Sequence, residues 1–147
     1  MATREEEVKP THDSFPLHAV EIYGPDDVGR CVLMAQRAAL QAGLDRTAQN
    51  RFATAVSELA QNVLRYAQRG RLTVRCLDRR GRRGAEAIVE DVGPGIENIE
   101  LAMQESVSTG GSLGLGLPGT RRMMDDFELH TVPGKGTRVT IRLWVQR

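Results

Sequence analysis

Residues 91–119 have the sequence DVGPGIENIELAMQESVSTGGSLGLGLPG, in which two glycine clusters flank a polar segment. Asp91 follows the mostly apolar run 85–89, which predicts a buried strand that ends at an acidic residue. Gly93 and Gly95 flank a proline, so the backbone is expected to leave the strand through a tight turn without Cβ atoms. We therefore expect a flat ligand to lie against this backbone while the Asp91 carboxylate accepts a hydrogen bond from it.

A second cluster of five glycines leads directly into an apolar pattern with helical spacing. These glycines are Gly110, Gly111, Gly114, Gly116 and Gly119. Exposed amides at the N-terminus of a helix bind phosphate groups. A carboxylate that can recognise a base, together with amides that can hold phosphates, indicates a nucleotide site.

Two common nucleotide-binding motifs do not explain these glycines. Gly114, Gly116 and Gly119 match the pattern G-x-G-x-x-G, but no strand of a βαβ unit precedes them, which argues against a Rossmann fold. The sequence also lacks the P-loop pattern G-x-x-x-x-G-K-[ST] and the H-R-D and D-F-G motifs of eukaryotic-type protein kinases. The nucleotide site therefore belongs to another class.

Composition narrows the class of protein further. The chain has 147 residues, enough for one domain, and its 20 basic and 19 acidic residues give a net charge of +1. This balance and an aromatic content of 4% argue against a dedicated nucleic-acid-binding protein. Cys31 and Cys76 form no C-x-x-C motif, the apolar runs are too short to span a membrane, and no signal peptide opens the chain. We therefore expect a reduced, soluble, cytoplasmic protein without membrane or nucleic-acid partners.

The first half of the chain predicts a strand followed by two helices. Residues 1–14 are polar and aperiodic, and we expect them to form a disordered tail before a single domain that spans residues 15–147. The expected bounds are 15–23 for the strand, from the N-cap Asp26 to Gly43 for the first helix, and from the cap Asp45 to Gln68 for the second helix.

The second half predicts strands around one further helix. The expected bounds are 71–77 and 85–89 for a hairpin, 117–125 for the helix, and 127–132 and 137–145 for two last strands. Because helices cluster early and strands surround the glycines, we expect an α/β fold, a two-layer sandwich with a mixed or antiparallel sheet. The turn of the hairpin, residues 78–84, has the sequence DRRGRRG. Its four arginines favour a solvated tip, with a contact to an acidic partner as the alternative.

Glu58 and Asn62 are four residues apart, so they lie on the same face of the second expected helix. The amide oxygen of Asn62 suits Mg²⁺, which keeps several waters and takes other ligands from phosphate oxygens. The Glu58 carboxylate, one turn away, could take a proton from a group that attacks the terminal phosphate. Alone, the pair would more often be two exposed polar residues, but Asp91 and the glycine clusters supply the rest of a nucleotide site.

Four segments resemble the boxes of the ATPase superfamily that contains gyrase, Hsp90, histidine kinases and MutL. They are SELAQN at 57–62, DVGPGI at 91–96, STGGSLGLGL at 108–117 and GKGT at 134–137. Within this superfamily the chain is similar to the bacterial anti-sigma-factor serine/threonine kinases, and among them to the switch kinases of the stressosome. The resemblance begins near Val20 and continues to the C-terminus. It implies a Bergerat-type ATP-binding fold, with a mixed, mostly antiparallel sheet covered by helices on one face.

The resemblance also implies roles for single residues, with ATP and Mg²⁺ as cofactors. Glu58 matches the general base of the family, Asn62 the magnesium ligand, and Asp91 the carboxylate that recognises the adenine amino group. The positions matched around the adenine are Gly93, Gly95 and Thr137, and those around the phosphates are Gly110, Gly114, Leu115 and Gly116. Residues 98–112 match a mobile lid.

For activity, the resemblance implies transfer of the ATP γ-phosphate to a serine or threonine of STAS-domain scaffold and antagonist proteins. Once released, the kinase would activate a PP2C-type phosphatase in a partner-switching stress response. Two alternatives stay open: an anti-sigma factor kinase that also sequesters a sigma factor, and a nucleotide-gated binding module without enzymatic activity. The presence of Glu58 favours an enzyme, because binding alone requires no base. A histidine kinase would need a dimerising helix pair with an acceptor histidine, and only 14 polar residues precede the first expected strand.

Overall fold

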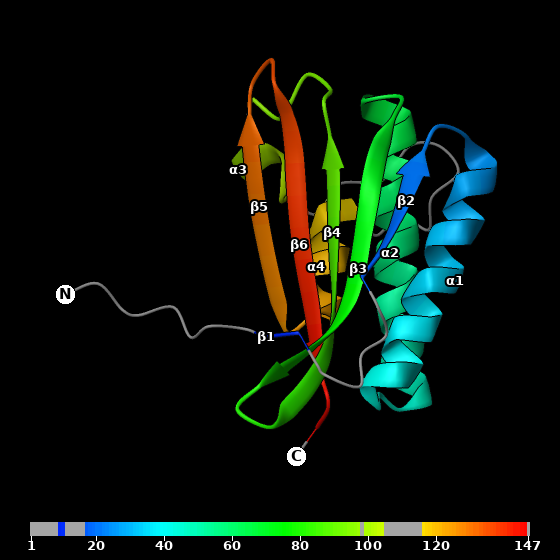
Figure 1. Cartoon of the computed structure of the whole chain (residues 1–147). Helices are drawn as coiled ribbons and strands as arrows, with labels where there is room; N and C mark the ends of the chain where they lie inside the picture. Colours follow the sequence, from blue (N-terminus) through cyan, green and yellow to red (C-terminus); the bar gives the residue numbers. More distant parts are fainter. Residues whose placement is uncertain (1–8, 11–16, 98, 105–115, 147) are drawn as a thin grey trace.

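The computed structural model describes residues 9–10, 17–97, 99–104 and 116–146, in which six strands form one sheet (Figure 1). The strands are β1 Lys9–Pro10, β2 His18–Ile22, β3 Gly70–Arg79, β4 Arg82–Asp91, β5 Asp126–Val132 and β6 Gly136–Trp144. Their order is β1-β3-β4-β6-β5, and β2 also pairs with β3. Every strand pairing among the described residues is antiparallel. The sheet is thus the mostly antiparallel one that the sequence predicts.

Three helices cover one face of this sheet and make the second layer (Figure 1). The helices among the described residues are α1 Pro25–Ala42, α2 Arg46–Tyr66, the short α3 Ile99–Ala102, and α4 Gly116–Met123. Helices α1, α2 and α4 form the cover, and α1 and α2 contact both β3 and β4. The expected two-layer α/β sandwich is therefore confirmed. Within the described part of the chain, no helix combines the length and apolar character needed to cross a membrane.

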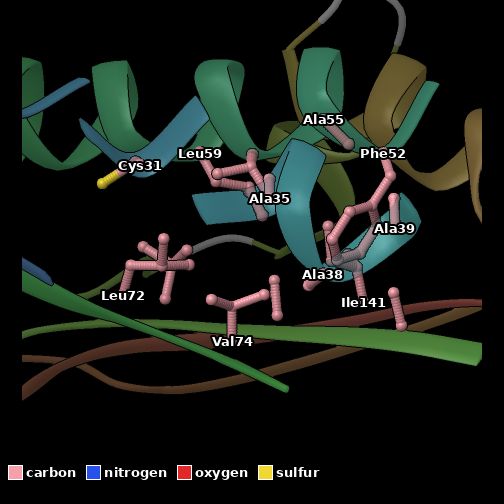
Figure 2. Packing of buried hydrophobic residues seen from close by; sticks show 14 of the residues in the cluster. Cys31, Ala35, Ala38, Ala39, Phe52, Ala55, Leu59, Leu72, Val74 and Ile141 are labelled. Carbon is pink, nitrogen blue, oxygen red and sulfur yellow. The ribbon is translucent and has the colours of Figure 1, made fainter. Parts of the chain in front are cut away.

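The core lies between the two layers, where alternate strand residues meet the inner faces of α1 and α2 (Figure 2). Leu72 and Val74 of β3 and Ile141 of β6 are fully buried against Phe52 and Leu59 of α2. Helix α1 contributes small side chains to the same core, namely Ala35, Ala38, Ala39 and Ala42. Small residues let α1 approach the sheet closely, so that the larger side chains of α2 fill the remaining volume.

Both cysteines belong to this core as free thiols. Cys76 donates a hydrogen bond from its sulfur to the carbonyl oxygen of Ala38 at 3.2 Å. Burial raises the pKa of the Cys31 thiol to about 12. The Cys31 side chain therefore stays protonated and packs as a small apolar group.

The capping residues predicted for the first two helices are wrong in one case and confirmed in two. Helix α1 begins at Pro25 with Gly24 as its N-cap, so the N-cap predicted at Asp26 is wrong. Proline fits the first helical position because its missing N–H needs no partner there. Gly43 ends α1 with a φ of 90°, as expected. The Asp45 side chain caps α2 by accepting a hydrogen bond from the Ala48 amide, also as expected.

The hairpin of β3 and β4 is longer than the sequence suggests. Pairing continues through Arg79 and Arg82, which leaves only Arg80 and Gly81 as the turn. Their φ angles of 53° and 81° are those of the tight turns that join twisted antiparallel strands. The seven-residue turn predicted at 78–84 is therefore wrong, because strand pairing extends into the charged residues on both sides.

Several further bounds differ from the sequence-based expectation. The first strand, expected at 15–23, is described as His18–Ile22, with residues 15–16 outside the described residues, and the second helix ends at Tyr66 instead of Gln68. Helix α4 ends at Met123 instead of residue 125, because the chain there turns to the sheet: the Asp125 amide, just before β5, donates to the Arg142 carbonyl of β6 at 3.1 Å. Two residues of the expected tail form β1, where Lys9 and Pro10 pair with β3. The rest of the tail lies outside the described residues.

A charged cluster occupies the sheet face that α1, α2 and α4 leave uncovered. Glu86 of β4 is only 1% exposed, and its two carboxylate oxygens accept hydrogen bonds from the Nε atoms of Arg75 and Arg142, both at 2.7 Å. Burial would lower the pKa of Arg142, but the hydrogen bond and charge of Glu86 raise it. Glu86 is thus a paired buried charge that cross-links three neighbouring strands, β3, β4 and β6.

Candidate functional site

Asp91 is the last residue of β4, and two backbone amides fix one of its oxygens. Oδ1 accepts hydrogen bonds from the amide of Gly93 at 2.9 Å and the amide of Thr137 at 3.3 Å. Among the described residues no donor contacts Oδ2. The half-buried carboxylate is therefore held in one orientation, with one oxygen able to accept a hydrogen bond from a ligand.

The turn after Asp91 packs so tightly that its glycines leave no room for side chains. A Cβ atom on Gly93 would lie 2.5 Å from the Cβ of Ala67, the residue that ends α2. A Cβ on Gly95, whose φ is 74°, would lie 2.5 Å from the carbonyl oxygen of Val132. The turn is thus pressed between the end of α2 and the β5–β6 connection. Residues 91–95 thus combine a fixed carboxylate with bare backbone, against which a flat base can lie. We call this segment the Asp91 wall.

Thr131 and Thr137 connect this wall to the last hairpin. They lie directly opposite each other on β5 and β6, and their hydroxyl oxygens are 3.0 Å apart. Thr131 Oγ1 also accepts a hydrogen bond from the Ile96 amide at 2.9 Å and donates one to the Gly136 carbonyl at 3.2 Å. The sequence analysis identified Thr137 and missed Thr131. Thr131 could have been identified only from its pairing with Thr137 across the two strands, which a single sequence does not show.

Glu58 and Asn62 both lie on α2, one turn apart, as expected. Glu58 is only 1% exposed and Asn62 is half-buried, so this pair is not a set of exposed surface residues. The same helix ends against the Asp91 turn through the close approach of Ala67 and Gly93. The helix that carries Glu58 and Asn62 is therefore also the helix that borders the Asp91 wall.

The phosphate end of the expected site is described only in part. Gly116 begins α4 with a φ of 54°, and its carbonyl accepts a hydrogen bond from the Thr120 hydroxyl at 2.9 Å. Three positions predicted to contact phosphates lie outside the described residues, namely Gly110, Gly114 and Leu115. Of the lid predicted at 98–112, residues 99–104 are described, and they include α3.

The side chains present are compatible with a magnesium ion bound mainly through a nucleotide. Within the described ranges, no three His, Cys, Asp or Glu side chains gather around a common metal position. The half-buried Asn62 offers one neutral oxygen ligand, so phosphate oxygens and water would have to complete an octahedral shell. This donor set fits Mg²⁺, which is typically held by few protein ligands together with substrate phosphates.

Comparison with known proteins assigns this arrangement to a family. The protein-family model described as "Histidine kinase-like ATPase domain" matches residues 24–143. The chain belongs to this family, whose name implies the use of ATP.

Individual relatives define the branch of the family. The chain is 40% identical over 113 residues to the protein "Serine/threonine-protein kinase RsbT" of Bacillus subtilis (strain 168), an alignment covering 77% of this chain and 85% of that protein. It is 34% identical over 128 residues to an "Anti-sigma F factor" of Caldanaerobacter subterraneus subsp. tengcongensis, covering 83% of this chain and 87% of that protein. It is 33% identical over 126 residues to the "Anti-sigma F factor" of Thermoanaerobacter sp. (strain X514), covering 82% of this chain and 85% of that protein. The predicted membership of the anti-sigma-factor kinases, which are serine/threonine-protein kinases, is thereby confirmed.

Gly136 provides a test of how the wall holds Asp91. A Cβ atom at Gly136 would lie 2.1 Å from the Asp91 carbonyl oxygen, and the φ of 128° already disfavours any side chain. Gly134 is the matched control, because its φ is 80° but nothing lies within 4 Å of its Cβ position. Gly134→Ala should cost about 1–2 kcal/mol of unfolding free energy from backbone conformation alone. Gly136→Ala should cost a further ~1–3 kcal/mol from the steric overlap, measured by urea denaturation. Equal losses in the two variants would contradict this close approach.

Proposed function

We propose that this serine/threonine-protein kinase transfers the γ-phosphate of ATP to a serine or threonine of STAS-domain scaffold and antagonist proteins. Once released from them, it would activate a PP2C-type phosphatase. The observation that carries the proposal is the buried Glu58 carboxylate on the helix that borders the Asp91 wall. A nucleotide-binding module alone would not require a buried carboxylate there, whereas phosphate transfer from a hydroxyl uses one as a base.

Each residue of the site would have a distinct role. Asp91 Oδ2 would accept a hydrogen bond from the adenine amino group, while the bare backbone at Gly93 and Gly95 lets the ring lie flat. When bound, ATP supplies the phosphoryl group and Mg²⁺ neutralises phosphate charge. Asn62 would hold the metal through its amide oxygen, and Glu58 would take the proton from the acceptor hydroxyl.

The kind of acceptor follows from the relatives and from charge. The relatives bear the names of a serine/threonine-protein kinase and of anti-sigma F factors, which supports a switch between protein partners. A phosphate left on the acceptor adds roughly −1.5 to −2 charge at pH 7. Close to Glu58 and the phosphates that remain on the nucleotide, this charge would be repelled. Phosphorylation would therefore weaken the complex and free the kinase for its next partner.

Asp91→Asn tests the recognition of adenine. The asparagine oxygen can still accept from the Gly93 and Thr137 amides, which turns its NH₂ group toward the position of Oδ2. A donor would then face the adenine amino group, and ATP binding should weaken by ~1–3 kcal/mol in titration calorimetry. Glu90→Gln, at the exposed neighbouring position on β4, is the control and should bind ATP as the parent does. Equal ATP affinity of Asp91→Asn and the parent would remove Asp91 from the adenine site.

Two substitutions on α2 separate the base from the metal ligand. Glu58→Ala should bind Mg-ATP normally but slow transfer to a STAS-domain protein by ~10²–10⁴-fold, the usual contribution of a positioned base. Asn62→Ala should lower the magnesium-dependent part of ATP affinity, because one oxygen ligand is lost. Arg51→Ala, an exposed position on the same helix, should change neither quantity. Transfer by Glu58→Ala at the parent rate, in single-turnover experiments, would show that Glu58 is not the base.

A further inference from the structure

The hydroxyl group of Thr131 is the centre of a small hydrogen-bond network beside the Asp91 wall. Its oxygen accepts from the amide of Ile96 at 2.9 Å and lies 3.2 Å from the carbonyl oxygen of Gly136. The hydroxyl oxygen of Thr137 is 3.0 Å away, directly across the strand pair β5–β6. The network therefore joins the chain that follows the wall to the strand whose amide holds Asp91.

The hydrogen atoms available in this network determine which group donates to which. A threonine hydroxyl has one hydrogen and two lone pairs. The Gly136 carbonyl can only accept, so the Thr131 hydrogen points to it; without that hydrogen, two oxygen atoms would face each other at 3.2 Å. The lone pairs of Thr131 then accept the Ile96 amide and the hydroxyl hydrogen of Thr137. Thr137 is therefore the donor of the threonine pair, and the Thr131 hydroxyl is fully used.

As a donor to Thr131, the Thr137 hydroxyl offers a ligand lone pairs but no hydrogen. Its side chain lies on the helix-covered face of the sheet, because the next residue but one on β6 is the buried Val139. Asp91 has the same relation to the buried Val89 on β4, so both side chains lie on one face. The two strands are neighbours, and the Thr137 amide donates to Asp91 Oδ1 at 3.3 Å. A ligand at this place therefore meets two acceptors, Asp91 Oδ2 and Thr137 Oγ1.

From this network we propose that Thr131 is a positioning residue that keeps the Thr137 hydroxyl an acceptor, so that the site selects a 6-aminopurine over a 6-oxopurine. This role rests on the proposed function, in which the base of the nucleotide lies against the Asp91 wall. The 6-amino group of adenine carries two N–H donors, one for Asp91 Oδ2 and one for Thr137 Oγ1. A 6-oxo group would face two acceptors with no hydrogen between them, which leaves buried polar atoms unsatisfied.

The test compares the binding of adenosine diphosphate (ADP) and inosine diphosphate (IDP), which differ at position 6 and the adjacent N1 of the purine. The measured quantity is the ratio of their dissociation constants in titration calorimetry. Thr131→Val removes the hydroxyl with little change of shape, so the Thr137 hydroxyl loses its acceptor and can turn its hydrogen toward a 6-oxo group. The preference for ADP should therefore fall roughly tenfold. Thr131→Ser keeps the hydroxyl and should keep the preference of the parent.

Thr137→Val tests the network from its other end and leaves the bonds of Thr131 to Ile96 and Gly136 in place. It removes the acceptor itself, so ADP should lose more affinity than IDP, and the preference should again fall roughly tenfold. Because Thr131 acts through Thr137, adding Thr131→Val to Thr137→Val should change the ratio no further. Thr140→Val is the control, at a buried threonine on the opposite face of β6, and should leave the ratio unchanged.

A purely structural role of Thr131 would weaken ADP and IDP by the same factor. An unchanged ratio in Thr131→Val, with ADP still bound, would therefore overturn the positioning role. If Thr131→Val does not fold, Thr137→Val decides: a preference for ADP as strong as that of the parent would show that Thr137 presents no selective acceptor. Failure of the parent to bind ADP would instead contradict the proposed function itself. Neither nucleotide carries a γ-phosphate, so the ratios are independent of phosphate transfer.

Discussion

The hydrogen bonds to Oδ1 of Asp91 determine the shape of the site, because they come from two different parts of the chain. Gly93 donates from the turn that follows β4, and Thr137 donates from the neighbouring strand β6. The carboxylate is thereby tied to the sheet, and its free oxygen has a fixed direction. A flexible carboxylate would pay an entropic cost to bind a base, whereas this one has already lost its rotational freedom in folding.

The hydrophobic core sets the position of the remaining residues. Helix α2 is fixed on the sheet by Phe52 and Leu59, and the same helix carries Glu58 and Asn62. Its last turn contacts the Asp91 turn at Gly93, where a side chain would not fit. Core packing therefore affects the geometry of the site. A change that displaces α2 also changes the distance between Glu58, the proposed base, and Asp91, the carboxylate proposed to recognise adenine.

Local signals in the sequence were sufficient for some features and not for others. Helix caps such as Asp45 depend on a few neighbouring residues, and the spacing of Glu58 and Asn62 follows from helix geometry alone, so both were predictable. Thr131 becomes part of the site only because it lies opposite Thr137 on the neighbouring strand. The β3–β4 turn is shorter than expected because strand pairing includes Arg79 and Arg82. Such features depend on contacts between distant residues, which local patterns do not contain. The roles assigned to Asp91, Glu58 and Asn62 stay predictions. The positions of these residues, with Glu58 and Asn62 on α2 and Asp91 in the adjacent wall, are compatible with those roles.

The most direct test is to incubate the protein with radiolabelled Mg-ATP and a STAS-domain protein, and then to treat the products with acid. Phosphate esters of serine and threonine survive acid, whereas phosphohistidine does not. Phosphate transfer to a protein hydroxyl predicts an acid-stable label on the STAS-domain protein, and the label should depend on magnesium. An acid-labile label, or tight ATP binding without any labelled partner, would contradict the proposed kinase reaction.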